Sequence, residues 1–422
     1  MASSAITGLL GLVFWAATAR LFPADQVGIA SALISSAIML STLSNLSLGA
    51  MYERFLPVCG NRAGRLLAQG FALVTAFALL LAVGLIVLGP RDTLFESDTL
   101  MLAYPALVVT LAVFALQDQT VSGLGVARWA AWKNTAHAAA KLAAVIALAW
   151  TGSALAILAS WGATAAVAAL TVLLAMRAKV VADPRYARDP ALPPRRELKA
   201  YFFSSYGISA LGSLAPLVVP LVVVSRIGAE ANAYFAVAWS LVSGLFIMVH
   251  LMVGPFVAEA AAHPDKVVAL SGRFVRTVTA LAVVGGVGMA AAGPLALGLV
   301  GDSYRENGSP ILYLASAFVP LSVVGAVYSG LARVYRRMTL AVTTQCISTV
   351  VIIVGSIVLT DAIGVAGVGW AYLVAELGTA VILIGPLISW LSRLRNRARW
   401  EQWLAAKYPQ QQPRWKVKHV QA

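Results

Sequence analysis

The chain has 422 residues, of which 60% are hydrophobic and only 11% are charged. Apolar runs recur along its whole length, which is typical of a polytopic membrane protein and excludes a soluble chain with a single core. The formal net charge of +14 would suggest a nucleic-acid partner in a soluble protein, but basic loops that orient a membrane protein account for it better. We therefore expect no nucleic acid to bind.

Twelve apolar stretches are long enough to cross a bilayer, which takes about 20 helical residues. The first lacks a basic leader and an obvious cleavage site, so it is predicted to be a span and not a signal peptide. The sequence therefore predicts an all-α polytopic membrane protein. The spans are expected near residues 3–22, 27–50, 66–89, 99–122, 131–150, 153–176, 200–225, 231–256, 275–299, 309–331, 338–359 and 363–390.

The connections between these spans differ in charge on alternate sides. Those on one side, together with the C-terminal tail, carry 26 of the 31 Lys and Arg, whereas those on the other side carry four arginines and eight acids. Because basic loops stay in the cytoplasm, both termini are predicted to be cytoplasmic, with the chain in the cytoplasmic (inner) membrane. The predicted outer loops are short, which argues against an enzyme that works on the outer face.

The longest connection, residues 177–199, is basic and contains prolines, and it is predicted to be a cytoplasmic linker. It separates an N-terminal six-helix lobe, residues 1–176, from a C-terminal six-helix lobe, residues 200–390. The basic tail, residues 391–422, is expected to lie on anionic membrane lipids, which attract Lys and Arg beside a membrane.

The two halves repeat one another at a nearly constant offset. Three matches indicate the repeat: Arg20 with Arg226 at 206 residues, Ser122-Gly123-Leu124 with Ser329-Gly330-Leu331 at 207, and Trp161 with Trp370 at 209. Since six spans is an even number, both lobes enter the membrane in the same direction, and the internal repeat is parallel. Such two-lobed chains are typical of transporters that rock about a site between the lobes.

Helix breakers occur in corresponding spans of the two halves. The first span carries Gly8 and Gly11, and the seventh carries Pro216 and Pro220. Both residue types ease bending of a helix, so these four residues are candidate hinges. The alternative is that Gly and Pro are simply common in membrane helices.

Three segments carry a resemblance to a known family: GLLGLVFWAATARLFPADQVGIASALIS, ERFLP and SGLGVARWAAWKNTAHAAAKLAAVIALA. They resemble the polysaccharide-biosynthesis flippases of the multidrug/oligosaccharidyl-lipid/polysaccharide exporter superfamily. The resemblance implies transfer of a polyprenyl-pyrophosphate-linked oligosaccharide across the membrane for surface glycan assembly. One loop departs from the family pattern, because Lys133 stands where the family tends to have an acid.

Asp118 and Lys141 are ionisable residues within predicted spans of the first lobe. Their repeat positions are Gly325 and Ser348, so both charges are absent from the second lobe. In one interpretation they form a pair that neutralises itself, as buried charges generally must. In the other, Lys141 faces the cavity and binds the pyrophosphate while Asp118 holds it ready.

Glu376 lies near the middle of the twelfth predicted span, with no lysine or arginine in the spans of its lobe. A lone buried carboxylate tends to be protonated. Glu376 is therefore a candidate for carrying a coupling proton or cation. The alternative is a neutral acid hydrogen-bonded to Gln345 or Tyr372.

Three further residues are candidates for substrate binding. His137 lies four residues before Lys141 and therefore on the same helical face. Arg20 and Arg226, at matching outer mouths, could guide an anionic substrate outward, or they could be ordinary interfacial anchors. Cys59 and Cys346 show neither metal-ligand nor redox spacing and are predicted to be unpaired.

The sequence contains no nucleotide-binding glycine loop, zinc spacing or nucleophile motif, so we expect no enzyme activity, cofactor or metal. The function expected is a lipid-linked oligosaccharide flippase that works by alternating access. One alternative is an ion-coupled small-molecule or multidrug antiporter. Another is a non-transporting scaffold that recruits glycan-assembly proteins through its basic inner surface.

Overall fold

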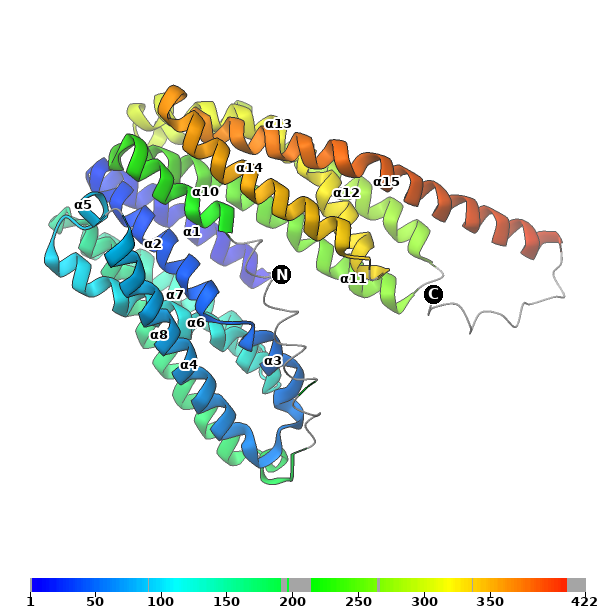
Figure 1. Ribbon diagram of the computed structural model, residues 1–422, viewed down its shortest axis with the longest axis horizontal. Helices are drawn as coiled ribbons and strands as arrows, with labels where there is room; N and C mark the ends of the chain where they lie inside the picture. The colour runs from blue at the N-terminus through cyan, green and yellow to red at the C-terminus, as the bar shows by residue number, and fades with distance from the viewer. Residues whose placement is uncertain are drawn as a thin grey trace.

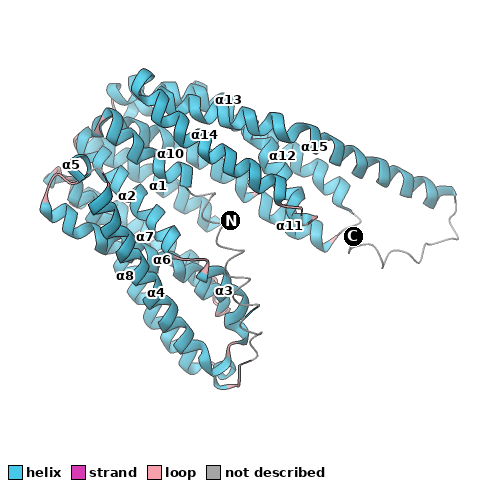
Figure 2. Ribbon diagram, in the orientation of Figure 1, coloured by secondary structure: helices cyan, strands magenta, loops and turns pink. Residues whose placement is uncertain are grey.

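The structure is a computed structural model that describes residues 2–89, 91–190, 196, 214–263, 266–335 and 337–407. Within these residues the chain is almost entirely helical and contains no strand (Figure 2). The predicted all-α class is therefore confirmed. Nine of the described helices are long and apolar enough to cross a membrane, and two shorter apolar helices accompany them.

The N lobe contains six long helices and a few short ones. The long helices are α1 (Ala2–Leu21), α2 (Ala24–Ser44), α4 (Ala63–Leu88), α6 (Asp98–Gly123), α7 (Arg128–Ala147) and α8 (Ala154–Ala182). The short ones are α3 (Leu48–Phe55), α5 (Arg91–Leu94) and four 3₁₀ turns, η1 (Leu56–Val58), η2 (Gly60–Arg62), η3 (Ala149–Thr151) and η4 (Pro184–Ala187).

The C lobe follows the same plan. Its described helices are Leu214–Ile227, α10 (Ala229–Leu251), α11 (Val253–Ala262), α12 (Val267–Val300), α13 (Asp302–Val334), α14 (Thr339–Ile363) and α15 (Ala366–Lys407). With α11 counted as the continuation of α10, the described helices of the two lobes account for all twelve predicted spans.

Several helices run further than the sequence indicated, and two of them, α8 and α15, extend into the expected linker and tail. α8 continues to Ala182, so the first six residues of the expected linker are helical, and the Asp183-Pro184 step ends the helix because a residue before proline avoids the helical conformation. α15 continues to Lys407, through an Arg- and Ala-rich segment of good helix formers. Residues 191–195 and 197–199 of the expected linker, and the tail after residue 407, lie outside the described residues.

Equivalent helices pack together in the same way in both lobes. α6 contacts α2, α4 and α8 in the N lobe, and α13 contacts α10, α12 and α15 in the C lobe. The turns before α8 and α15 are also equivalent, and each holds a glycine at positive φ, Gly152 at 61° and Gly364 at 63°. These shared pairings and turns are what a parallel repeat of two six-helix lobes requires.

The two lobes touch at one end and diverge toward the other (Figure 1). We call the touching end the closed end; it carries the turns at residues 22–23, 148–153, 228, 301 and 364–365. There the Nδ2 of Asn232 on α10 donates to the carbonyl of Gly28 on α2 at 2.8 Å, and the Nη1 of Arg20 on α1 donates to the Leu299 carbonyl on α12, also at 2.8 Å. At the closed end, hydrogen bonds from polar side chains of one lobe to backbone carbonyls of the other thus connect the two lobes.

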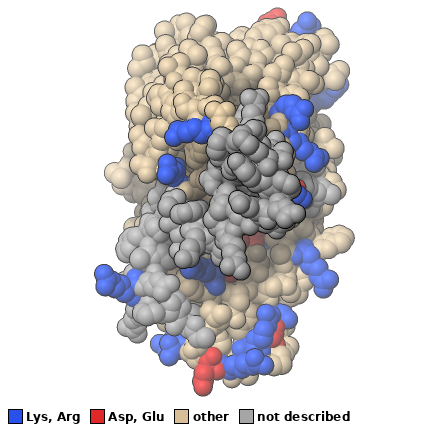
Figure 3. All heavy atoms as spheres, turned by 90° about the vertical axis from the view of Figure 1, so that its right-hand side faces the viewer, with Lys and Arg blue, Asp and Glu red and all other residues tan. Residues whose placement is uncertain are grey.

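The opposite end, which we call the open end, is rich in Lys and Arg (Figure 3). α1 begins and α15 ends on this side (Figure 1). Exposed arginines in and beside the described connections at this end include Arg54, Arg62, Arg65, Arg128, Arg185, Arg188, Arg273, Arg276, Arg333, Arg337 and Arg393. Their positions match the basic side of the charge pattern in the sequence.

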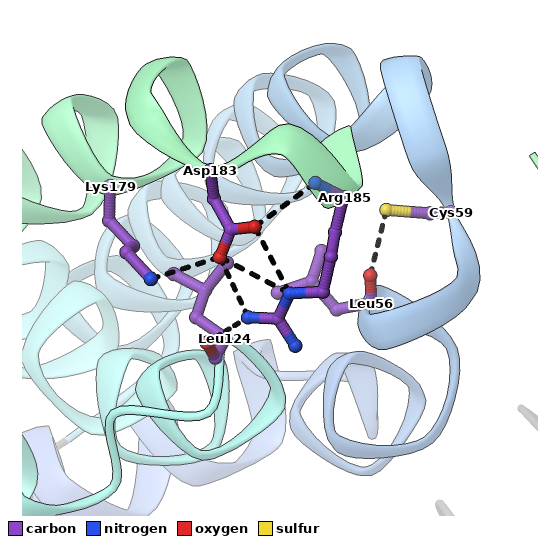
Figure 4. A network of polar contacts seen from close by, with 6 residues as sticks. All are labelled: Leu56, Cys59, Leu124, Lys179, Asp183 and Arg185. Carbon is purple, nitrogen blue, oxygen red and sulfur yellow. Dashed lines mark hydrogen bonds and ion pairs between the residues drawn. The ribbon is translucent and has the colours of Figure 1, made fainter. Parts of the chain in front are cut away.

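A polar network fixes the segment after α8 to the open end of the N lobe (Figure 4). The Asp183 carboxylate forms ion pairs with two side chains. Its Oδ2 lies 2.9 Å from Lys179 Nζ and 2.8 Å from Arg185 Nη2. Arg185 also donates to the Leu124 carbonyl at 3.4 Å, and Asn61 N donates to the Arg188 carbonyl at 2.8 Å. Because the hydrogen bonds from Arg185 and Lys179 favour the carboxylate, the pKa of Asp183 is held well below its usual range.

We expect Gly28→Val to separate the lobes at the closed end. A Cβ on Gly28 would lie only 1.6 Å from the Ala229 carbonyl oxygen, so α2 and α10 must move apart. The measurement is the distance between spin labels at positions 25 and 302, with Cys59 and Cys346 replaced by Ala. Gly84→Val is the control, because a Cβ there meets nothing within 4 Å. An unchanged distance distribution in Gly28→Val would show that this contact does not hold the lobes together.

Candidate functional site

Helix α7 carries an unusual polar face for a membrane-embedded helix. Lys133, His137 and Lys141 follow one another at intervals of four residues, so they lie on one side of the helix. All three side chains are buried. This face packs toward α1, α6 and α8, inside the N lobe.

Asp118 on α6 pairs with Lys133, and the predicted pair with Lys141 is therefore wrong. Lys133 Nζ lies 2.8 Å from Asp118 Oδ1, and Asn134 Nδ2 donates to Asp118 Oδ2 at 3.0 Å. The turn between the helices explains this choice, because Asp118 lies five residues before α6 ends and Lys133 lies five residues after α7 begins. The two residues are therefore at the same depth on neighbouring antiparallel helices.

The ammonium group of Lys133 has further partners besides Asp118. Its ammonium group also donates to the Phe114 carbonyl and lies 3.6 Å from the centroid of the Phe114 ring. Its side chain is 1% exposed, whereas that of Asp118 is 34% exposed. We interpret Lys133 as a structural partner of Asp118, which leaves Lys141 without an acid.

Lys141 is held by aromatic rings. Its ammonium group lies 3.4 Å from the ring centroid of Trp161 on α8 and 5.0 Å from that of Phe14 on α1. Among the described residues it makes no hydrogen bond or ion pair, although its side chain is only 7% exposed. Cation–π contacts of this kind stabilise a desolvated ammonium but leave its N–H donors available to an anion.

His137 lies between the two lysines on the same face. Thr164 Oγ1 is 3.0 Å from His137 Nδ1, and the same hydroxyl donates to the Ser160 carbonyl at 2.6 Å. The Trp161 Nε1–H is buried and has no acceptor in the described part of the chain. We call Phe14, His137, Lys141 and Trp161 the lysine site.

Two exposed tryptophans indicate the depth of the lysine site in the membrane. Trp132 and Trp150, near the two ends of α7, are 74% and 84% exposed. Eighteen residues of helix span about 27 Å, close to the thickness of the hydrocarbon layer, and tryptophan prefers both membrane interfaces. Lys141 lies halfway between them, which puts it near the middle of the membrane.

Glu376 lines a cavity of about 240 Å³ inside the C lobe. Gln345 lines the same cavity, but no hydrogen bond to Glu376 occurs among the described residues. The Tyr372 hydroxyl, one turn earlier on α15, is buried and also lacks a partner in the described structure. The predicted alternative of an acid hydrogen-bonded to Gln345 or Tyr372 is therefore not found.

The two matched arginines have different partners, although both lie at the closed end. Arg20 bridges the lobes through the Leu299 carbonyl, whereas Arg226 Nη1 pairs with Asp361 Oδ2 at 2.8 Å within the C lobe. Neither is brought near the lysine site by its contacts.

The candidate hinge residues lie in unbroken helices. A Cβ on Gly8 or Gly11 in α1 would meet nothing within 4 Å, so these glycines are not required for packing. Pro216 and Pro220 lie in the helix Leu214–Ile227. Their role in bending stays a prediction.

The described residues bear on the predictions about metal ligands and cysteines. They contain no group of three His, Cys, Asp or Glu side chains placed to hold a metal ion. Cys59 and Cys346 are free, as predicted.

The architecture defines a multi-pass membrane protein of two repeated helical lobes. No protein-family model matches the sequence, and no curated protein matches it significantly. Its fold is nevertheless shared with solved structures of the MOP superfamily, which confirms the fold expected from the family resemblance.

Three of these structures illustrate the likeness. An inward-facing multidrug resistance MATE family transporter has a TM-score of 0.65 at 13% identity, covering 93% of this chain and 96% of that one. Lipid II flippase MurJ, in an inward closed conformation, has a TM-score of 0.68 at 11% identity, covering 91% and 86%. An outward-facing MATE transporter scores lower, 0.57 at 14% identity, covering 93% and 95%.

The sequence did not indicate the pairing of Lys133 with Asp118 or the aromatic partners of Lys141. Lys133 falls at the start of a predicted span, where a lysine usually reaches toward water. Its position five residues after the helix start, matching that of Asp118 before the turn, was the available signal. The two rings lie on two other helices, α1 and α8, so no local pattern could have indicated them.

We expect Asp118→Asn to destabilise the protein more than the double variant Asp118→Asn with Lys133→Met. The single change leaves a buried ammonium unpaired, which costs roughly 3 kcal/mol, whereas the double change removes both charges. The measurement is the thermal midpoint of the purified protein in detergent. Asp98→Asn, at an exposed acid on the same helix, serves as the control and should change little. Additive effects of the two changes would contradict the pairing.

Proposed function

We propose that this protein flips a polyprenyl-pyrophosphate-linked oligosaccharide across the cytoplasmic membrane for surface polysaccharide assembly. The fold supports a transporter, because two parallel lobes that meet at one end suit alternating access. Flipping of a lipid-linked substrate is supported by the fold shared with the flippase MurJ and by the family resemblance of the sequence.

The observation that carries the proposal is the lysine site. An ammonium near the middle of the membrane is costly and needs compensation, and no acid in the described part of the chain pairs with Lys141. Two donors, Lys141 Nζ and Trp161 Nε1, lack acceptors among the described residues. A pyrophosphate group offers the negative charge and oxygen acceptors that these donors require. His137, beside Lys141, extends the same polar face.

The orientation follows from charge. We propose that the basic open end faces the cytoplasm, with both termini there and with anionic lipids or glycan-assembly proteins as its neighbours. The lobes, residues 1–176 and 200–390, would then be separated on the cytoplasmic side, where a lipid-linked glycan is made available. Glu376, within the C lobe, is the proposed site for a coupling proton or cation.

A multidrug antiporter is the second candidate. The observation in its favour is that the MATE transporters have the same two-lobed fold over almost the whole chain. The lysine site argues for an anionic cargo over a cationic drug, because an unpaired ammonium repels a cation.

We expect Lys141→Met to fold normally and to slow transport roughly tenfold or more, because a charge-assisted hydrogen bond to the cargo is lost. The measurement is transfer of a fluorescent polyprenyl-pyrophosphate-linked sugar between leaflets of proteoliposomes. Lys141→Arg should keep more activity than Lys141→Met. Lys266→Met, at an exposed lysine of the open end, is the control. A fully active Lys141→Met protein would contradict the proposed role of this residue in binding the cargo.

Deletion of the gene distinguishes the two candidate functions. A flippase predicts that lipid-linked oligosaccharide accumulates in the inner leaflet, which is measured by extracting the lipids and testing their access to an impermeant reagent. Greater drug sensitivity with an unchanged glycan pool would instead identify an antiporter.

A further inference from the structure

The C-lobe cavity lies among α10, α11, α13, α14 and α15. The repeat relates it to the polar cluster of the N lobe. At the offset of 207 residues, Asp118, Asn134, His137 and Lys141 correspond to Gly325, Ala341, Thr344 and Ser348, and all four of the latter line the cavity. Small side chains thus leave space in the C lobe where long polar side chains fill the N lobe.

The cavity is polar and charged at both ends. A Cβ on Gly325 of α13 would be 3.5 Å from Thr379 Cγ2 of α15, so these two residues lie at the same depth. Glu376 lies three residues before Thr379 on α15. Arg333 lies eight residues after Gly325, toward the open end. With 1.5 Å per helical residue, the backbone positions of Glu376 and Arg333 differ in depth by about 16 Å. The cavity therefore has an acid at its inner end and a base near the open end.

The groups at the two ends do not neutralise one another. No ion pair joins Glu376 to Arg333 in the described structure, and Arg333 is exposed. His250 is also exposed and lines the cavity. Its Nδ1 donates to the Phe246 carbonyl at 2.8 Å, and its Nε2 has no hydrogen-bond partner among the described residues. Between the ends, hydroxyl and amide groups such as Ser329, Thr344 and Gln345 line the wall.

We propose that this cavity binds a small zwitterionic solute that enters from the open end. Its ammonium group lies against Glu376, and its carboxylate lies against Arg333 and His250. Such a ligand brings to Glu376 the positive charge that a coupling cation would otherwise supply. The site is separate from the lysine site in the other lobe, so this proposal stands or fails independently of the cargo.

The test uses ω-amino acids as probes, because their chain length sets the distance between the two charges. Binding of 4-aminobutyrate and 6-aminohexanoate to the purified full chain is measured by calorimetry, with butyrate and butylammonium as single-charge references. We expect at least one ω-amino acid to bind at least tenfold more tightly than either reference. Glu376→Gln and Arg333→Gln should each weaken that binding at least tenfold.

A variant that fills the cavity tests the need for space in it, without changing the charges at its two ends. Ser348→Met places a larger side chain in the space and should abolish binding, whereas Cys346→Met, on the same helix but outside the cavity lining, should not. Size-exclusion profiles establish that each variant is folded. Equal binding of butylammonium and the ω-amino acids, no binding of any probe to the folded wild-type chain, or binding unaffected by Glu376→Gln would each overturn the proposal.

Discussion

Charge inside a membrane must be compensated, and this constraint organises the N lobe. Asp118 and Lys133 neutralise each other across the α6–α7 turn, and Asn134 completes the carboxylate's hydrogen bonds. Lys141 has no such partner among the described residues, and the rings of Trp161 and Phe14 stabilise it instead. Helix α7 therefore carries one lysine, Lys133, that is paired with an acid. Two turns further on it carries a second, Lys141, whose ammonium group is available to bind an anion.

The repeat gives both lobes the same helix packing but not the same interior. Buried positions that hold long polar side chains in the N lobe hold Gly, Ala, Ser and Thr in the C lobe, and a cavity results. The backbone pairing is conserved between the lobes because helices contact through equivalent faces. The side chains inside have diverged, so one lobe presents a cation and the other an acid.

The closed end links these interiors to lobe movement. Gly28 and Ala229 bring α2 and α10 so close that no side chain fits between them, and Asn232 and Arg20 add hydrogen bonds across the same interface. Arg20 and Phe14 of the lysine site lie on the same helix, α1, six residues or about 9 Å apart. Separation of the lobes at this end must break these contacts, and α1 carries both the Arg20 contact and the Phe14 ring that lies against Lys141.

The sequence by itself determined the helical class, the span number, the two lobes and the repeat. Each of these depends on local hydrophobicity or on similarity between distant segments, and both are visible in one dimension. The tertiary structure alone decided that Asp118 pairs with Lys133, because the choice depends on equal depth across an interhelical turn. It also decided that Lys141 meets aromatic rings and that Glu376 faces a cavity, since those neighbours come from helices remote in the chain.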